Sequence, residues 1–179
     1  MASLTNTGIL QGSGNNSYGG LKSVWITELS NIDYDSLDID SDGVITGMTS
    51  AFVTGITMYK YNSNDQAAYH NQTATIDDTA GTTVIIQELL MKFAKQDADK
   101  RNEMKYFATV RTVAIIEDWQ GEYYLVGAQK GLRPSVLNTT SGAAGEDPNG
   151  YDITLTGKEP DFAPLIISKS TFSSYIDVA

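Results

Sequence analysis

The sequence predicts a strand-rich domain with a single α-helix packed on its flank. Most of the chain consists of short apolar runs with period-two alternation, separated by turn residues such as Asp-Gly. One stretch, residues 96–109, has helical spacing instead. It follows a strand-like run at 82–93 and leads directly into a hairpin at 111–129. This order predicts a mainly β fold in which the helix is an isolated addition.

The composition suits one domain without cysteine chemistry. A chain of 179 residues is long enough to bury about 70% of its unfolded surface. Its 22 acids against 12 bases give a net charge of −10. Phosphates need Lys and Arg, so we expect no tightly bound nucleic acid, although this charge is compatible with DNA that only slides past. We expect neither a transmembrane helix nor a signal peptide, because no long apolar run and no basic-then-apolar start is present.

The chain divides into an arm, one β-rich domain and a tail. Residues 1–20 are rich in Gly, Ser and Asn and predict a flexible N-terminal arm. Residues 21–167 contain all the predicted strands and the helix. Within them, residues 131–150 lack periodicity and predict a long loop, a feature that usually binds something or stays disordered. Residues 168–179 are expected to form an extended or disordered C-terminal tail.

The first strand is predicted at residues 21–29. Period-two alternation divides its side chains between two faces. Val24 and Ile26 lie on one face, and Trp25 and Thr27 lie on the other.

Three further strands are predicted before residue 80, at residues 44–48, 51–61 and 67–76. Asp42-Gly43 is the turn signal that precedes the first of these. In the second, Phe52, Ile56 and Met58 fall on one face.

Residues 82–93 are compatible with two structures. As a strand, one face carries four apolar side chains: Ile85, Leu89, Met91 and Phe93. As a helix, the segment has an apolar stripe: Ile86, Leu89, Leu90 and Phe93. The β-branched start of the segment favours the strand.

The predicted helix begins after Asp97, which is a suitable N-cap residue. Met104, Phe107 and Ala108 follow the spacing of a helix that lies on a surface. The basic residues of segment 92–111 alternate with acids, which indicates a solvent-exposed face rather than a phosphate site.

The remaining strands are predicted from alternation and turn signals. Residues 111–118 and 122–129 form the clearest hairpin. A strand follows at 151–157, and a final strand is predicted at 164–167.

The sharpest motif is the acidic segment 38–45, DIDSDGVI. It matches the first eight positions of an EF-hand calcium loop. The twelfth position, which needs a bidentate acid, holds Thr49, and both flanks are predicted strands. The segment is therefore interpreted as an acidic β-turn, with weak calcium binding at Asp38–Asp42 as the alternative.

Other candidate groups give no convincing site. Glu117 with Glu122, or Glu159 with Asp161, has the residue types for acid–base catalysis, but the sequence defines no separation between them. His70 has no second His or Cys with which to share a metal ion. The sequence therefore predicts no catalytic, cofactor-binding or metal-binding residues.

Four short sequence segments resemble those of a known class of protein: GGLK at 19–22, DGVIT at 42–46, DKRNEMK at 99–105 and NGYDITLTGKEP at 149–160. They resemble virion structural proteins of phages that infect Bacteroidetes, including the crAss-like group. The order of hairpins, single helix and Gly-rich loop is similar to that of phage tail-tube proteins. The resemblance implies a β-sandwich or barrel with a flanking helix, assembled as rings around a DNA channel. Six-fold rings are usual in long tails, and twelve-fold rings occur in short-tail barrels.

The expected function is that of a non-enzymatic structural subunit in the virion. Its partners would be copies of itself and other tail or portal-proximal proteins, with DNA as passing cargo, no cofactor and no membrane. The alternative is a capsid decoration or receptor/carbohydrate-binding module, in which Trp25, Trp119 and tyrosines form a sugar platform. A virion hydrolase is a third possibility, but the sequence offers no suitable acid/base or metal constellation.

Overall fold

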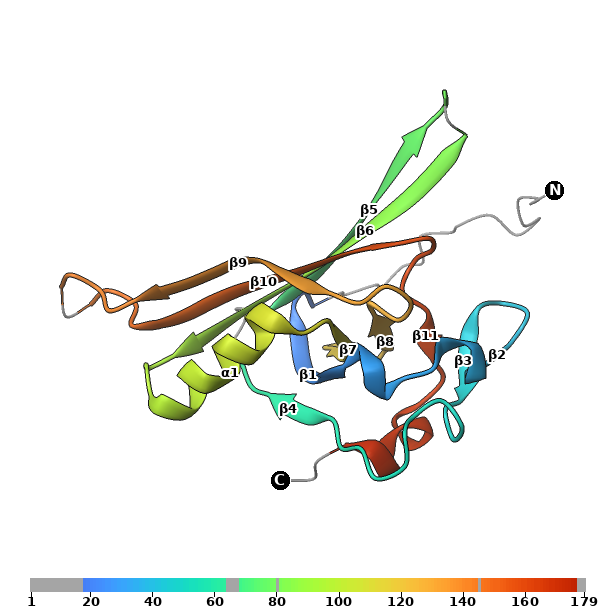
Figure 1. Ribbon diagram of the computed structural model, residues 1–179, viewed down its shortest axis with the longest axis horizontal. Helices are drawn as coiled ribbons and strands as arrows, with labels where there is room; N and C mark the ends of the chain where they lie inside the picture. Colours follow the sequence, from blue (N-terminus) through green and yellow to red (C-terminus); the bar gives the residue numbers. More distant parts are fainter. Residues whose placement is uncertain (1–17, 64–67, 80, 145, 177–179) are drawn as a thin grey trace.

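The computed structural model describes residues 18–63, 68–79, 81–144 and 146–176 of the chain. In this part the protein is mainly β, with two sheets and one α-helix at their flank (Figure 1). The strand pairs are antiparallel except for the pair formed by β3 and β11. The predicted β-sandwich with a single flanking helix is therefore confirmed within these residues.

The larger sheet has seven strands in the order β2-β3-β11-β8-β7-β1-β4. In that order, its strands are Asp38–Ile39, Val44–Gly47, Leu165–Ile166, Tyr123–Val126, Thr112–Asp118, Leu21–Glu28 and Tyr59–Tyr61. The smaller sheet has four strands in the order β5-β6-β10-β9. These strands are Tyr69–Asp77, Thr82–Ala94, Gly150–Glu159 and Arg133–Thr140. The described part also contains α1 (Ala98–Thr109) and four short 3-10 helices: Leu29–Asn31, Tyr34–Ser36, Lys169–Thr171 and Ser173–Tyr175.

The central strands of the larger sheet bury both of their faces. On β1, Val24 and Ile26 enter a first core, which lies between the two sheets. Trp25 enters a second core on the opposite face of the larger sheet. The predicted division of this strand into two faces is therefore confirmed, and the larger sheet is the middle layer of the molecule.

Residues 82–93, for which the sequence allowed either a strand or a helix, form strand β6. Its buried positions alternate through the first core, where Leu89 and Met91 are fully buried. β6 pairs with β5 on one side and with β10 on the other. The strand interpretation is confirmed because its inner face supplies one side of the first core.

The helix α1 closes one flank of the first core. The side chain of Asp97 accepts a hydrogen bond from Lys100 N at 2.9 Å, so the predicted N-cap is confirmed. Met104 and Phe107 are buried, whereas Ala108 is exposed. The apolar stripe is thus narrower than predicted, because only Met104 and Phe107, in the C-terminal half of the helix, are buried.

The prediction of a long loop at residues 131–150 is wrong. Residues 133–140 form β9, which pairs with β10 along its length. The segment lacks hydrophobic periodicity because β9 is an edge strand: every residue except Pro134 is exposed, so neither face had to be apolar. A register shift occurs beside Pro134, between Thr154 and Leu155 of β10.

The predicted strand at residues 51–61 is also wrong, since only Tyr59–Tyr61 is a strand. Gly55 has φ +83° and interrupts the extended backbone. Phe52 and Met58 are nevertheless buried, because this irregular segment folds over the second face of the larger sheet. The spacing of Phe52 and Met58 thus reflects burial in the second core and not a β-strand.

The C-terminal segment is packed into the second core rather than extended or disordered. Phe172 is fully buried, with ring centroids 5.6 Å from Trp25 and 5.4 Å from Tyr123. Tyr175 stacks on Phe52 at 4.7 Å. Residues 168–176 therefore belong to the domain. Residues 177–179, like residues 1–17 of the predicted arm, lie outside the described part of the chain.

Candidate functional site

The smaller sheet ends in two long strands that are paired on one side only. Within the described residues, β5 pairs only with β6, and β9 only with β10. At the end of β9 the Gln96 side chain donates to Thr140 O at 2.7 Å, and helix α1 lies close to this strand. Most residues of both strands are exposed. The sheet therefore presents free backbone N–H and C=O groups along two edges.

The edge strands β5 and β9 lack most of the features that prevent an edge strand from pairing with another chain. Edge strands are usually kept short, or carry Lys, Pro or bulges that block pairing with another chain. β5 contains no Lys or Pro, and its one charged residue is Asp77 at its end. In β9 the charge and the proline stand at the beginning, at Arg133 and Pro134, and the rest is uncharged. Both edges are consequently suited to pairing with a further strand.

The hairpins of the smaller sheet extend beyond the body of the molecule (Figure 1). The β5–β6 hairpin projects from one side, and the β9–β10 hairpin extends along the long axis in another direction. Near the β5–β6 turn, Ile76 is 67% exposed. A two-stranded hairpin that stands alone in water is only marginally stable. The projecting part is thus suited to contact with another molecule.

The acidic charge is concentrated at hairpin turns. The β2–β3, β5–β6, β7–β8 and β9–β10 turns each carry two carboxylates: Asp40 and Asp42, Asp77 and Asp78, Asp118 and Glu122, and Glu146 and Asp147. One aspartate in each turn accepts hydrogen bonds from backbone N–H groups: Asp40, Asp77, Asp118 and Asp147. In the β9–β10 turn, these N–H donors lower the pKa of Asp147. Eight of the 22 acids thus lie at these turns, and four of them stabilise the turn backbone.

The EF-hand-like segment forms the predicted acidic turn. It connects β2 to β3, with Gly43 at φ +80° and Asp40 Oδ1 accepting from Asp42 N and Val44 N at 2.9 Å each. Asp40 is therefore engaged with the backbone of its own turn. Among the described residues, no group of three or more His, Cys, Asp or Glu side chains is arranged to hold a metal ion.

The structure gives Glu117 and Glu122 different environments. Glu117 is buried and forms an ion pair with Lys22 at 2.7 Å. It also accepts a hydrogen bond from Tyr123 Oη at 3.3 Å. The bond to Glu117 raises the pKa of Lys22. Glu122 lies exposed at the turn, so the two carboxylates do not share a site.

Glu159 has a structural role that the sequence did not reveal. It is 3% exposed, and its carboxylate accepts from the backbone N–H groups of Gln129 (3.3 Å), Lys130 (2.9 Å) and Gly131 (3.1 Å). Burial raises its pKa, while these N–H donors act in the opposite direction. Asp161, its predicted partner, instead offers its backbone carbonyl to Gln87 Nε2 at 3.1 Å. Glu159 therefore holds the β8–β9 turn against the smaller sheet, whereas Asp161 contacts β6.

We expect Glu159→Ala to lower the free energy of unfolding by about 2 kcal/mol, because buried N–H donors lose their acceptor. Urea denaturation measures this loss. Glu122→Ala removes an exposed carboxylate and is expected to change stability by less than about 0.5 kcal/mol. Equal effects of the two substitutions would show that the contacts of Glu159 are unimportant.

His70 lies on the inner side of β5. Its Nε2 is buried without a hydrogen-bond partner among the described residues, and its ring lies 6.4 Å from that of Tyr124. Burial lowers the pKa of His70 to about 4. A single imidazole in this environment packs at the edge strand, and no metal-binding cluster of His, Cys, Asp or Glu includes it among the residues that the structure describes.

His70 gives the protein a defined pH dependence. Its pKa is about 4 in the folded state and about 6.5 when unfolded, so the unfolded chain binds more protons between these values. We expect stability to fall by on the order of 2 kcal/mol as pH decreases from about 6.5 to 4. Since His70 is the one histidine of the chain, the difference between wild type and His70→Phe in urea denaturation isolates this contribution. Parallel stability curves for the two proteins would refute it.

Of the two tryptophans predicted to form a sugar-binding platform, one is buried in the structure. Trp25 is 2% exposed in the second core, so it cannot stack on a ligand. Trp119 is 44% exposed at the β7–β8 turn and contacts the ring of Tyr18 at 5.7 Å. The two tryptophans thus do not form a joint surface.

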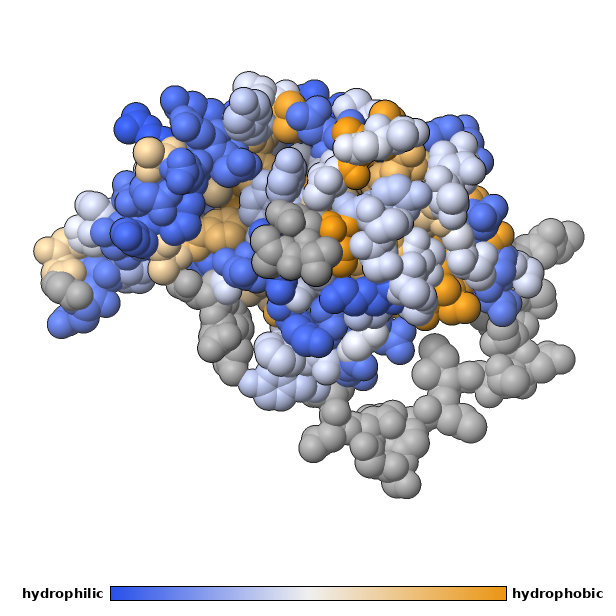
Figure 2. Space-filling view, turned by 90° about the horizontal axis from the view of Figure 1, so that it is seen from below, coloured by the Kyte–Doolittle hydropathy of each residue, from blue (hydrophilic) through white to orange (hydrophobic). Residues whose placement is uncertain are grey.

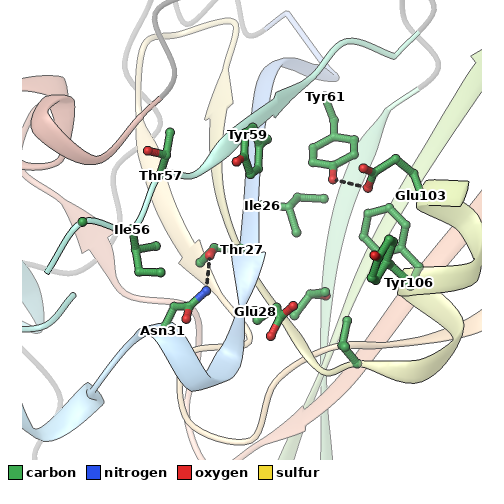
Figure 3. Close-up of a pocket in the computed structure, with 14 residues that line it drawn as sticks. Ile26, Thr27, Glu28, Asn31, Ile56, Thr57, Tyr59, Tyr61, Glu103 and Tyr106 are labelled. Atoms are coloured by element: carbon green, nitrogen blue, oxygen red, sulfur yellow. Dashed lines mark hydrogen bonds between the residues drawn. The ribbon is translucent and has the colours of Figure 1, made fainter. Parts of the chain in front are cut away.

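A groove lies between β4 and α1. Its volume is about 360 Å³. Figure 3 shows Tyr59, Tyr61 and Tyr106 around the opening, with Glu103 and Glu28 among them. The Tyr61 hydroxyl donates to Glu103 Oε2 at 3.0 Å. The sequence could not predict this groove, because its walls come from segments far apart in the chain.

The outer surface is mixed in character. Figure 2 shows hydrophilic side chains over most of the end that carries α1, with apolar side chains in smaller patches elsewhere on that face. None of the helices in the described residues has the length and apolar character needed to span a membrane.

Comparison with known proteins gives no relationship: no protein family matches the chain, and no characterised protein or solved structure is significantly similar to it.

Proposed function

We propose that the chain is a non-enzymatic structural subunit of a phage virion that self-assembles into tail-tube or tail rings around the DNA-ejection channel. The observation that carries this proposal is the smaller sheet, whose two outer strands, β5 and β9, are long and have no further strand partner among the described residues. Helix α1 lies close to β9, and Arg133 and Pro134 stand only at the beginning of that strand. The resemblance of the sequence to phage tail-tube proteins suggests the biological setting.

The position of the two edges supports the proposed ring formation. β5 and β9 lie at opposite ends of one sheet and have different sequences. Pairing β9 of one copy with β5 of the next is a head-to-tail contact, and such contacts close into rings when the rotation between copies permits. The result is a continuous sheet that forms the channel wall. Six or twelve copies per ring are the numbers that the resemblance suggests.

The solvent-facing side of the smaller sheet suits DNA as passing cargo. On β6 and β10 it carries two acids and two bases: Glu88, Asp152, Lys92 and Lys158. Lys92 lies 3.9 Å from Asp152, so one of these bases is paired. Tight binding to DNA needs many free Lys and Arg contacts with phosphates. A balanced face of this kind would let DNA move past without being held.

The test of this proposal is the state of the purified protein as its concentration rises. Size-exclusion chromatography with light scattering is expected to show a large species that increases with concentration. Negative-stain microscopy of the same fractions is expected to show rings or short tubes. A protein that remains monomeric at high concentration, with no rings or tubes in stain, would contradict the proposal.

A further inference from the structure

The groove between β4 and α1 is lined by no residue of β5 or β9, the two strands that the proposed ring would use as edges. One wall is formed by β1 and β4, and the other by α1. The groove needs no role in ring closure, so an inference about it does not depend on the proposed function.

The groove combines aromatic rings with carboxylates. Tyr59 is 59% exposed and Tyr106 is 62% exposed, so both rings are accessible to a ligand. Glu28 and Glu103 are the two charged residues that line it, and both are acidic. Cations bind favourably over aromatic faces and beside carboxylates. The lining therefore favours an ammonium or guanidinium group.

The two carboxylates are available to such a cation. Glu103 accepts the Tyr61 hydroxyl through Oε2, and Glu28 accepts Ser30 Oγ at 3.4 Å. Within the described residues, neither forms an ion pair with Lys, Arg or His. Both side chains are exposed at the surface. The charge of the groove is thus not neutralised by the domain itself.

A free strand edge runs beside the groove. β4 is the last strand of the larger sheet and pairs only with Val24, Trp25 and Ile26 of β1. Its outer edge has no strand partner in the described part of the chain. An extended peptide can add to such an edge through main-chain hydrogen bonds, with side-chain pockets supplying specificity.

We propose that this groove binds an extended basic segment of another protein, which adds to β4 as a strand and places a Lys or Arg side chain against Tyr59, Tyr106 and Glu103. A second copy of the chain is a poor occupant. The chain has a net charge of −10, which has the same sign as the two carboxylates of the groove. Charge complementarity selects a partner with a basic segment.

The experiment uses the full chain and two short labelled peptides, acetyl-Thr-Val-Arg-Val-Thr-amide and the same peptide with citrulline in place of arginine. Citrulline keeps the shape of arginine but has no charge. Fluorescence anisotropy measures affinity, and NMR of the protein maps the site. The arginine peptide is expected to bind at least tenfold more tightly than the citrulline peptide and to shift the signals of Tyr59 and Tyr106.

Two variants locate the interaction. Glu103→Gln keeps an oxygen that can accept the Tyr61 hydroxyl but removes the charge, and it is expected to weaken binding of the arginine peptide at least fivefold. Asp99→Asn is the matched control, since Asp99 is an acid on the same helix that does not line the groove. This variant is expected to bind like the wild type. Circular dichroism verifies that both variants are folded.

Three results would overturn the proposal. The first is equal affinity for the arginine and citrulline peptides, or no binding of either. The second is an equal effect of Glu103→Gln and Asp99→Asn, which would indicate only a general effect of net charge. The third is that chitotriose, a neutral sugar, shifts the tyrosine signals while the arginine peptide does not, which would assign the groove to carbohydrate.

Discussion

Phe172→Ala is expected to lower the free energy of unfolding by about 3–5 kcal/mol, the range for removing a large buried aromatic side chain. Phe172 is 0% exposed and makes edge-on contacts with Trp25 and Tyr123. It also joins the C-terminal segment to the middle layer of the molecule. Its removal leaves a cavity in the second core, which urea denaturation measures as a lower midpoint.

Phe162→Ala is the matched control for this substitution. Phe162 is 53% exposed, and it lies just before β11 in the chain. We expect its replacement to change stability by no more than about 0.5 kcal/mol. If Phe172→Ala were as mild as Phe162→Ala, the C-terminal segment would not be an integral part of the domain.

Val136→Lys is expected to abolish assembly while leaving the domain folded. Val136 lies in the middle of β9 and is 42% exposed. A charged lysine in the middle of an edge strand is one of the features that oppose pairing with a second strand. β5, the proposed partner strand, offers no acid to pair with it except Asp77 at its end. In light scattering, the variant is expected to remain monomeric at concentrations at which the wild type forms its large species.

Val53→Lys provides the control, because it makes the same chemical change at a position outside the strands that is 52% exposed. This variant is expected to assemble like the wild type. Loss of assembly in both variants would indicate a general effect of charge. Normal assembly of Val136→Lys would exclude β9 as an interface.

The sequence predicted those parts of the fold in which one face must be apolar. β6 is an example, since Leu89 and Met91 alternate with partly exposed residues across the first core. The helix could likewise be predicted from the sequence, because Asp97 caps it through a hydrogen bond to a residue that is close in the chain. In such elements the requirement for burial determines the residue pattern directly.

The wrong predictions for β9 and for residues 51–61 have a common physical cause. In both segments the pattern of apolar side chains does not correspond to the backbone structure. β9 is stabilised by main-chain pairing with β10, so its exposed side chains carry no signal. Conversely, Phe52 and Met58 are buried by an irregular segment, and their alternation imitates a strand. The burial of Phe172 depends on residues far away in the sequence, which no local pattern reports.

The candidate sites were less predictable than the fold. The function of Glu159 depends on the distant β8–β9 turn, and the groove depends on bringing β4 beside α1. The two free edges could be identified only after the strand order was known. What the sequence did indicate was the absence of an obvious catalytic pattern and a resemblance to self-assembling virion proteins.

Covalent cross-linking of the two edges tests the central proposal most directly. The chain has no cysteine, so Thr73→Cys on β5 and Val136→Cys on β9 introduce the sole thiols. With a short bismaleimide, the double variant is expected to give a ladder of covalent multimers that ends at the ring size, whereas each single variant stays monomeric on a denaturing gel. A double variant that remains monomeric, or single variants that form dimers as efficiently, would contradict head-to-tail pairing of β5 with β9.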